Sequence, residues 1–402
     1  LRRQRQMCIR DSSYIDATKC CGCENCAIVC PTNAIEMKPD KEGFLQPYID
    51  NRKCVNCGKC ENNCPLLNDV SFNNEIYEEY YGYIDKEDQC CKSASGGMAQ
   101  ALYKYIIERQ GIIYGVEYTK NFESAVYKRV DTKNYQKLLG TKYSQARKGN
   151  IFKLVLKDLC EEKLVLFVGV PCEIAALKIF LGKEYEKLIT VQLVCMGVTS
   201  PKLLESLKNE IIKNNTEIVN IVERYTYKNW SVPFICLKTE NDKVLIPFDT
   251  SYYAYGYNSF GRLSCYECKF KGENRVGDIT IGDFWGAEKY LKHINKKGMS
   301  IVSIHTFKGK RVLEQCGFNK FKMELPYDWN NCNPFVCMSR TNKKKRKDFS
   351  YNYINNDYNL KKACNITMSF SEKLKWNLGR TIPNSVWTEL YKIKSFLDKY
   401  IM

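Results

Sequence analysis

Histidine is scarce in this chain, with only two among 402 residues. His293 and His305 stand in no ligand pattern, so we interpret both as ordinary residues rather than metal ligands. No apolar run approaches the length of a membrane-spanning helix, and the longest, 164–170, suits a buried strand. The first ten residues contain no apolar segment typical of a secretory signal. These absences argue against a histidine-based metal centre and against a chain that spans a membrane.

Cysteine, by contrast, is abundant, with 22 residues, and eight of them form two copies of one spacing near the N-terminus. In each copy three cysteines are separated by two residues, and a fourth follows after three more and precedes a proline. The first copy consists of Cys20, Cys23, Cys26, Cys30 and Pro31, and the second of Cys54, Cys57, Cys60, Cys64 and Pro65. This doubled pattern is that of bacterial ferredoxins with two 4Fe–4S clusters.

In such ferredoxins the three closely spaced thiolates bind one cluster, and the cysteine before proline binds the other. The pattern therefore assigns one cluster to Cys20, Cys23, Cys26 and Cys64, and the other to Cys54, Cys57, Cys60 and Cys30. A disulfide framework and zinc sites are the alternatives, but tetrahedral zinc explains neither the repeated spacing nor the doubled Cys-Pro. Free thiolates need a reducing compartment, which favours the cytoplasm. The function thus begins with one-electron transfer.

Beyond this module the sequence pattern changes, and predicted strands and helices alternate from residue 80 onward. Strands are predicted over 80–84, 111–118, 164–170, 188–195, 217–227, 232–239, 243–248 and 300–306. Helices are predicted over 98–109, 151–162, 173–181, 201–214, 310–316, 372–378 and 386–400. This alternation predicts an α/β domain with a largely parallel sheet, so the fold class is a multidomain α+β and α/β chain.

These changes in sequence pattern divide the chain into five segments. They are a leader interpreted as non-native (1–13), the ferredoxin module (14–70), two parts of the mixed α/β unit (71–150 and 151–330) and a basic helical tail (331–402). The ferredoxin module is too small to fold around a large core, so its clusters must stabilise it.

Four further cysteines form a second candidate metal site. Cys172 follows a predicted strand, Cys195 ends the next one, and Cys265 and Cys268 form a Cys-x-x-Cys pair. Successive parallel strands end at the same sheet edge, so these soft ligands suffice for a third 4Fe–4S cluster. Buried structural thiols beside a redox or zinc Cys-x-x-Cys pair are the alternative. The other cysteines that we considered share no spacing and are interpreted as structural: Cys8, Cys90, Cys91, Cys160, Cys236, Cys316, Cys332, Cys337 and Cys364.

Two short segments could contact a phosphate or a flavin. Ser93–Gly97 is a small-residue loop before a predicted helix, whose N-terminal amides could approach a phosphate. Lys142 and Tyr143, within Gly140–Ser144, place a cation beside an aromatic ring. Ordinary turns use the same residues, so both signals are weak by themselves. The stretch Arg275–Gly286 combines glycines, two aspartates and a Phe-Trp pair, and it is either a ligand-lining loop or a generic turn.

The net charge of the chain is +17, and much of it lies near the C-terminus. A run of five basic residues, 343–347, could suggest nucleic acid or an anionic membrane surface. No segment resembles a nucleic-acid-binding fold, so we expect a solvated basic segment and no nucleic acid. Acidic redox partners would also suit a basic surface.

Taken together, the motifs resemble one family, the coenzyme F420 hydrogenase/dehydrogenase beta subunits, in the form preceded by a two-cluster ferredoxin. The matching stretches occur in the family order over roughly residues 14–325. They are Ser93–Gly97, Gly140–Tyr143, Phe167–Cys172, Cys195–Val198, Cys265–Cys268 and Gly282–Gly286.

The resemblance implies an iron–sulfur flavoprotein, with FAD and a further 4Fe–4S cluster beside it. In this chain it implies cluster ligands at Cys172, Cys195, Cys265 and Cys268, and FAD contacts at Ser95, Gly96, Gly97, Lys142 and Tyr143. The segments 71–150 and 151–330 would be the N-terminal and C-terminal domains of the beta subunit, forming a flavin-binding unit.

The chain departs from the family at two places. Met196 stands where a histidine is common, and Val170–Glu173 replaces Thr-Pro-Cys-Gln. Because a histidine can donate a proton, its loss leaves the deazaflavin substrate of the family in question. The hydride donor or acceptor therefore stays open, and we expect the partner to be either a redox partner protein or a small-molecule hydride donor or acceptor.

We interpret the chain as a cytoplasmic oxidoreductase that passes electrons between a hydride-exchanging FAD and 4Fe–4S clusters. No side chain is assigned as a catalytic acid, base or nucleophile. One alternative is an electron-relay subunit that carries clusters but no flavin and no substrate site. Another is a binding protein in which the clusters are structural. The sequence does not indicate the oligomeric state, the direction of electron flow or the cluster potentials.

Overall fold

The computed structural model describes residues 15–381 except 71–75, 86–92, 212–216, 227–229, 231, 273–274, 288–290, 292–293 and 324–332, and also residue 386. The expected leader lies outside the described residues, as do most of the predicted helix 386–400 and the cysteines at positions 8, 90, 91 and 332. Among the helices of the described part, none is long and apolar enough to cross a membrane.

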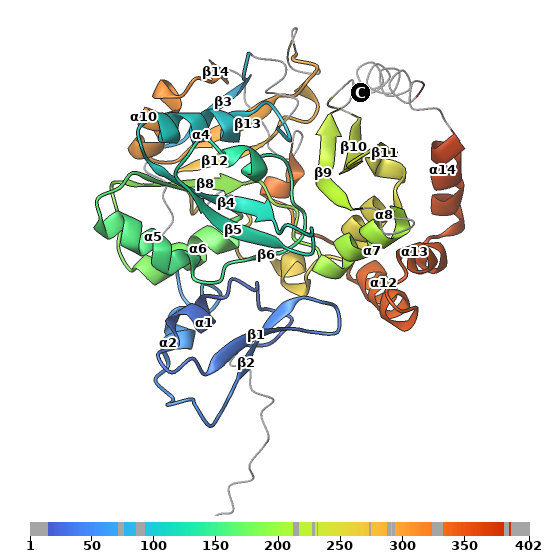
Figure 1. Ribbon diagram of the computed structural model, residues 1–402, viewed down its shortest axis with the longest axis horizontal. Helices are drawn as coiled ribbons and strands as arrows, with labels where there is room; N and C mark the ends of the chain where they lie inside the picture. The colour runs from blue at the N-terminus through green and yellow to red at the C-terminus, as the bar shows by residue number, and fades with distance from the viewer. Residues whose placement is uncertain are drawn as a thin grey trace, which may run out of the picture.

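The N-terminal cysteine motifs fold as a small module, drawn in blue at the bottom of Figure 1. Its elements are α1 (Asn25–Val29), β1 (Ile35–Pro39), β2 (Leu45–Ile49) and α2 (Lys59–Asn62). The strands β1 and β2 pair antiparallel, with Ile35 opposite Ile49. Each helix begins within a cysteine motif, so the two motifs frame the hairpin.

A nine-stranded mixed sheet forms the body of the molecule, in the order β14-β3-β13-β12-β8-β7-β4-β5-β6. Its strands are β3 (Glu78–Tyr83), β4 (Ile112–Tyr118), β5 (Ala125–Val130), β6 (Ala146–Arg147), β7 (Val165–Gly169), β8 (Leu188–Leu193), β12 (Ile279–Asp283), β13 (Ser300–Ile304) and β14 (Asn319–Lys322). The central strands β4, β7, β8 and β12 are parallel, as the alternation predicts. Strands from both 71–150 and 151–330 belong to this one sheet.

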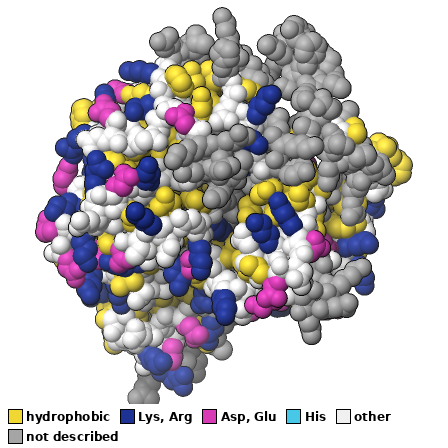
Figure 2. Space-filling view, turned by 45° about the horizontal axis from the view of Figure 1, so that its top comes forward, with side chains coloured by type: hydrophobic (Ala, Val, Ile, Leu, Met, Phe, Trp, Pro, Cys, Tyr) yellow, Lys and Arg dark blue, Asp and Glu magenta, His cyan; other side chains and the backbone are white. Residues whose placement is uncertain are grey.

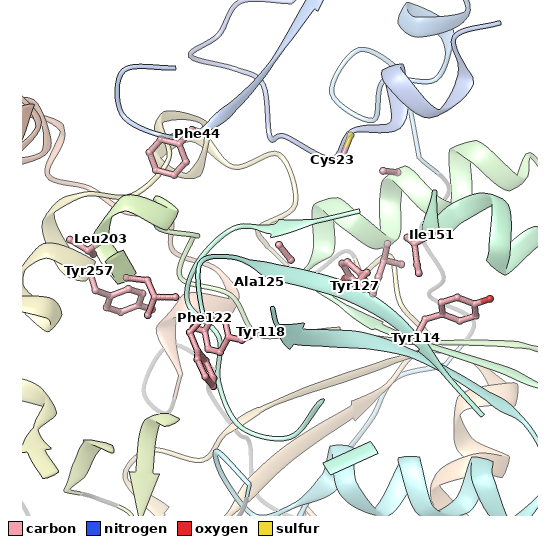
Figure 3. Packing of buried hydrophobic residues seen from close by; sticks show 14 of the residues in the cluster. Cys23, Phe44, Tyr114, Tyr118, Phe122, Ala125, Tyr127, Ile151, Leu203 and Tyr257 are labelled. Carbon is pink, nitrogen blue, oxygen red and sulfur yellow. The ribbon is translucent and has the colours of Figure 1, made fainter. Parts of the chain in front are cut away.

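Helices cover both faces of this sheet. They are α4 (Met98–Glu108) and α10 (Phe307–Gln315) on one face, and α5 (Ile151–Cys160) and α6 (Pro171–Leu181) on the other. Alternation along β7 explains the two cores: Phe167 packs with α5 and α6, whereas Leu166 and Val168 pack with α4. The α5–α6 core extends into the ferredoxin module, where Figure 3 shows Cys23 and Phe44.

A separate antiparallel sheet with its own helices lies on the right of Figure 1. Its elements are α7 (Pro201–Ile211), β9 (Ile218–Thr226), β10 (Pro233–Thr239), β11 (Lys243–Pro247) and α8 (Tyr252–Ser259). The helices α12 (Lys343–Asn355), α13 (Leu360–Thr367) and α14 (Phe370–Thr381) pack beside it. Single-turn helices lie at η1 (Tyr135–Leu138), η2 (Phe248–Thr250), η3 (Leu263–Glu267) and η4 (Pro334–Val336).

The basic tail contacts the rest of the protein through charged side chains. In α12, Arg346 forms a bidentate ion pair with Glu42 of the ferredoxin module. On the face shown in Figure 2, Lys and Arg side chains are spread among Asp and Glu rather than gathered in one patch. The high net charge is therefore not concentrated on this face.

Candidate metal centre

The first cysteine motif is buried against the body of the protein. Cys20 and Cys64 are 8% and 5% exposed, and they pack together in one small cluster with Ile15. Cys64 belongs to the second motif, so the chain brings it to the side of the first, as the crossed ligand assignment requires. The amide of Gly22 donates to Cys20 Sγ at 3.4 Å. We call this group the inner motif, with ligand candidates Cys20, Cys23, Cys26 and Cys64.

The second motif faces outward. Cys57 is exposed, whereas Cys30, Cys54 and Cys60 are partly buried. The amide of Ala34 donates to Cys30 Sγ at 3.2 Å, a bond of the kind that tunes cluster potentials. We call Cys30, Cys54, Cys57 and Cys60 the outer motif.

The other four predicted ligands meet at one cavity of about 230 Å³. Cys172 lies in the first turn of α6, Cys195 lies just beyond the end of β8, and Cys265 and Cys268 lie in and after η3. All four line this cavity, although the chain separates the first from the last by almost a hundred residues. We call it the third-site cavity.

Local sequence explains why these segments converge. Pro171 opens α6, and the carboxylate of Glu173 accepts from the amide of Val170 at 3.2 Å, which fixes the strand-to-helix turn. At Gly197, with φ of +121°, an added Cβ would lie 2.9 Å from Cys265 Cβ. Glycine at this place lets the segment after Cys195 approach η3 closely.

The pKa is raised for three of the thiols in this cavity, those of Cys172, Cys195 and Cys268. Burial raises the pKa of Cys195 to about 12, and the neighbouring thiols Cys265 and Cys268 act in the same direction. Lys271 acts against them, and its ammonium donates to the carbonyl of Cys195. Such thiols would lose their protons to bound iron, because a coordinated thiol is deprotonated outright. No group of three or more His, Cys, Asp or Glu among the described residues is arranged to hold a single metal ion.

Arg262 joins the inner motif to the body of the protein, and sequence reasoning missed it. It is 1% exposed. Its guanidinium donates to the carbonyls of Cys20 at 2.6 Å and Leu45 at 2.8 Å, and to Gln145 Oε1 at 2.8 Å. Glu24 adds a second connection by accepting from the amide of Lys148 at 2.8 Å. A single arginine in a turn carries no sequence signal for such a role.

Cys21 is a further residue that the spacing did not single out, because it is outside the ligand pattern. It lines the third-site cavity together with Cys172, Cys195, Cys265 and Cys268. A comparison of the two motif copies would have marked it, because the second copy has Val55 at the same place.

The predicted phosphate loop packs against the edge of the body. Ser95 Oγ donates to the carbonyl of Met299 at 2.5 Å. An added Cβ at Gly96 would lie 2.5 Å from the Gly82 carbonyl oxygen and from the Ser300 amide nitrogen. Gly97, with φ of +94°, is the residue before α4. The close approach to strands explains the two glycines.

Lys142 and Tyr143 form the second predicted flavin segment. Lys142 Nζ donates to the carbonyls of Leu139 at 2.6 Å and Lys137 at 2.9 Å, and burial lowers the pKa of Lys142 to about 7. The ring of Tyr143 lies 4.2 Å from that of Tyr257, between ring centroids. Arg340 connects this pair to the third-site cavity by donating to the carbonyls of Tyr257 at 2.5 Å and Met196 at 3.2 Å.

A charged group from β9 and β12 connects the two predicted flavin segments. Arg224 forms an ion pair with Asp283 and lies over the ring of Trp230, 5.4 Å from its centroid. Trp230 Nε1 donates to the carbonyl of Ala94 at 3.0 Å, next to Ser95. The segment Arg275–Gly286 therefore contributes Asp283 to this region, and β12 occupies the middle of the segment.

Glu223, beside Arg224 on β9, is fully buried. Its carboxylate accepts from the amide of Tyr143 at 2.6 Å and from the hydroxyl of Tyr253. Burial raises the pKa of Glu223. The Nε atom of Arg224 is also buried and has no hydrogen-bond partner within the described part of the chain. Predicted strand 217–227 gave no signal for either residue, because a single sequence does not show which strand faces a site.

Two segments of the chain match known protein families. Residues 162–324 match the family model for the C terminus of the coenzyme F420 hydrogenase/dehydrogenase beta subunit. Residues 19–67 match the 4Fe-4S dicluster domain. No curated protein sequence matches the chain. A chain in a xenon-derivatised structure of the F420-reducing NiFe hydrogenase complex from Methanosarcina barkeri is similar, with 17% identity and a TM-score of 0.45, over 67% of this chain and 88% of that chain.

Proposed function

We propose that the chain is an iron–sulfur flavoprotein oxidoreductase, because residues 162–324 match the family model for the C terminus of the coenzyme F420 hydrogenase/dehydrogenase beta subunit and residues 19–67 match the 4Fe-4S dicluster domain. Its electrons would pass between a hydride-exchanging FAD and three 4Fe–4S clusters. The observation that carries this proposal is the convergence of Cys172, Cys195, Cys265 and Cys268 on one cavity. That cavity adjoins the inner motif on one side and the Tyr143–Tyr257 pair on the other.

The third-site cavity suits a 4Fe–4S cluster by the chemistry of its donors. The four predicted ligand thiols line it from three separate segments, with Cys21 as a fifth thiol, and such a cluster takes four thiolates. Lys271 brings positive charge to its wall, and Arg340 donates to the carbonyl of Met196, which also lines the cavity. Positive charge favours an anionic cluster. The amide of Gly197 donates to Cys195 Sγ at 3.2 Å, as amides do toward cluster ligands.

FAD, when bound, would supply the exchange between a two-electron hydride step and single-electron steps. The residues that would hold it are the predicted set Ser95, Gly96, Gly97, Lys142 and Tyr143, now joined by Arg224 and Glu223. The buried Nε of Arg224 is a free donor within the described part of the chain, and the Tyr143 ring offers an aromatic surface. The buried carboxyl of Glu223 could keep or release a proton in the place of the absent histidine.

One observation favours the alternative, an electron relay without flavin. Ser95 Oγ and Lys142 Nζ already have partners within the chain, and Lys142 donates to several backbone carbonyls. In that case the clusters would serve two other proteins. In either case thiolate ligands require reducing surroundings, so we place the protein in the cytoplasm, with a redox partner at the outer motif.

Anaerobic reduction of the loaded protein tests the proposal. Nicotinamide and deazaflavin donors are added in turn, and the flavin and cluster bands are followed by absorption. We expect flavin bands above the broad cluster absorption, and their bleaching before the clusters are reduced. In a Cys265→Ser variant the flavin should still bleach while the ferredoxin clusters stay oxidised. Cluster absorption without flavin would instead support the relay.

A further inference from the structure

Arg340 is a buried cation from the basic tail, 331–402, and its side chain reaches the third site. The residue lies between η4 and α12 and is 7% exposed. Its guanidinium enters between the loop after β8 and the end of α8. Nε donates to the carbonyl of Met196 at 3.2 Å, and Nη1 donates to the carbonyls of Tyr257 at 2.5 Å and Asn258 at 3.0 Å.

Two glycines allow Arg340 to lie close to the ligand candidate Cys265. An added Cβ at Gly197 would lie 2.8 Å from Arg340 Nε, 2.9 Å from Cys265 Cβ and 3.3 Å from Cys265 Sγ. An added Cβ at Gly261 would lie 2.6 Å from Arg340 Nε. The guanidinium and the Cys265 thiol therefore both lie beside Gly197, which lines the third-site cavity.

Within the described part of the chain, Arg340 forms no ion pair with a carboxylate. Its acceptors are backbone carbonyls, and its Cζ atom lies 5.0 Å from the centroid of the Tyr257 ring. Its Nη2 atom is buried and has no hydrogen-bond partner among the described residues. Burial of a charge is costly unless an opposite charge lies close to it. The burial of Arg340 therefore indicates an anion other than a protein side chain beside it.

Two other buried arginines show how this chain treats such charges. Arg346, in the same tail, forms an ion pair with Glu42. Arg262 donates only to carbonyl and amide oxygens, and one of them is the carbonyl of Cys20 in the inner motif. A buried arginine without a described carboxylate partner thus lies beside the inner motif, and Arg340 lies in the same way beside the third site.

A 4Fe–4S cluster bound by four thiolates would supply the missing negative charge at Arg340. Reduction of such a cluster adds one electron and therefore one more negative charge. A cation fixed nearby stabilises the reduced form more than the oxidised form, so it raises the reduction potential. A guanidinium suits this task because it stays protonated in proteins.

We propose that Arg340 is the counter-charge of the third cluster and sets the reduction potential of that cluster. This inference rests on the proposed function, because it needs the third cluster. Arg340 is not a ligand, and no bond forms or breaks at it. The electron concerned is the one that the third cluster gains and passes on in the proposed function, and Arg340 changes only how strongly the cluster holds that electron.

Three variants of the full-length loaded protein separate charge from structure. Arg340→Gln removes the charge and keeps an amide donor, whereas Arg340→Lys keeps the charge. Lys347→Gln removes one charge from an exposed place in the same tail and is the matched control. Iron content is measured for each, together with the potential of each cluster by redox titration followed with electron paramagnetic resonance.

All three variants should retain the iron content of the unmodified protein, about twelve atoms per chain. In Arg340→Gln, reduction of the third cluster should become about tenfold less favourable relative to the ferredoxin clusters, a lowering of its potential by about 59 mV for one electron. Arg340→Lys should recover most of this shift, and Lys347→Gln should show none.

An unchanged potential of the third cluster in Arg340→Gln would overturn the proposal. An equal shift in Arg340→Gln and Arg340→Lys would overturn it too, because hydrogen bonds rather than charge would then set the potential. If Arg340→Gln loses about four iron atoms, Arg340→Lys decides: about twelve atoms and an unchanged potential support the counter-charge, and the same loss in both variants contradicts it. An unmodified protein with only about eight iron atoms would instead remove the third cluster, and the proposed function with it.

Discussion

The two copies of the cysteine motif share one spacing and one backbone path but differ in what surrounds them. Both copies adopt left-handed conformations at the same two places: Gly22 and Asn56 at the third residue, and Glu24 and Gly58 at the fifth. The inner copy is packed against the body, whereas the outer copy exposes Cys57 and Val55.

The residues between the ligands account for this difference. At Gly22 an added Cβ would overlap the Gln145 side chain, whereas Asn56 keeps its side chain in the open outer copy. Glu24 accepts a left-handed conformation because its carboxylate bonds to the amides of Lys148 and Gly149, and Gly58 at the same place has no such neighbours. Ligand spacing thus specifies the cluster, and the intervening residues specify what the cluster faces.

The largest expected effect comes from replacing Arg262, the arginine that joins the inner motif to the body of the protein. Arg262→Met should lower the free energy of unfolding by about 4 kcal/mol, because buried carbonyls lose charged donors. Anaerobic guanidinium unfolding of the loaded protein measures it. The control is Arg52→Met, a change at an exposed residue just before Cys54 of the outer motif, and this variant should unfold like the unmodified protein. Equal behaviour of the two variants would contradict the difference between the copies.

The next largest effect distinguishes a glycine of the inner copy, Gly22, from a glycine of the outer copy, Gly58. Gly22→Ala should destabilise by about 3 kcal/mol, since left-handed strain adds to overlap with Gln145 and Arg262. Gly58→Ala, with φ of +69° and nothing within 4 Å, should cost only the strain, about 1 kcal/mol. Urea titrations of both variants provide the comparison, and a smaller cost at Gly22 than at Gly58 would refute the packing argument.

Replacing Glu24, the fifth residue of the inner copy, by the glycine of the outer copy should have an intermediate effect on stability. Glu24→Gly removes the acceptor for the Lys148 and Gly149 amides, and we expect a loss of about 2 kcal/mol after relief of left-handed strain. Thermal unfolding and iron release both report it. Glu24→Gln, which keeps one acceptor oxygen, should lie between the two, and a Gly variant as stable as the unmodified protein would count against this second connection.

The smallest effect is expected at the outer surface, where Asp50 pairs with Arg52. Hydrogen bonds from Arg52 lower the pKa of Asp50, so any contribution exists at neutral pH and is lost as the pH falls through that lowered pKa. Because the pair is exposed, Asp50→Asn should leave the melting temperature nearly unchanged at neutral pH and identical to the unmodified protein in acid. A clear loss at neutral pH would show that the outer copy is also held by charge.

Local signals in the sequence predicted the elements that carry the site. The apolar run at 164–170 became β7, and the cysteine after it lies at the carboxyl edge of the sheet, beside the one that follows β8. Spacing found the eight ferredoxin cysteines and the pair Cys265 and Cys268, because a cluster imposes a fixed local pattern. Cys172 and Cys195 were instead predicted from their places at the ends of strands. The middle of the segment Arg275–Gly286 forms strand β12, and Asp283 at the end of this strand forms an ion pair with Arg224.

Long-range packing was not predictable in the same way. Arg262, Glu223 and Arg224 acquire their roles only when distant segments meet, and no local pattern marks them. Helix α8, with its tyrosine-rich sequence, showed no clear periodicity. The basic tail was expected to be a solvated segment, yet Arg346 in α12 is buried in its ion pair with Glu42. A single charged run cannot show which of its members turns inward.

Iron counting with Mössbauer spectroscopy tests the central claim most directly, because it measures whether the third-site cavity holds a cluster. The unmodified protein, loaded anaerobically, should contain about twelve iron atoms per chain, all in 4Fe–4S clusters. Cys265→Ser should lose about four of them and keep the ferredoxin signals unchanged. An unmodified protein with about eight iron atoms, and a Cys265→Ser variant with the same number and spectrum, would contradict the account.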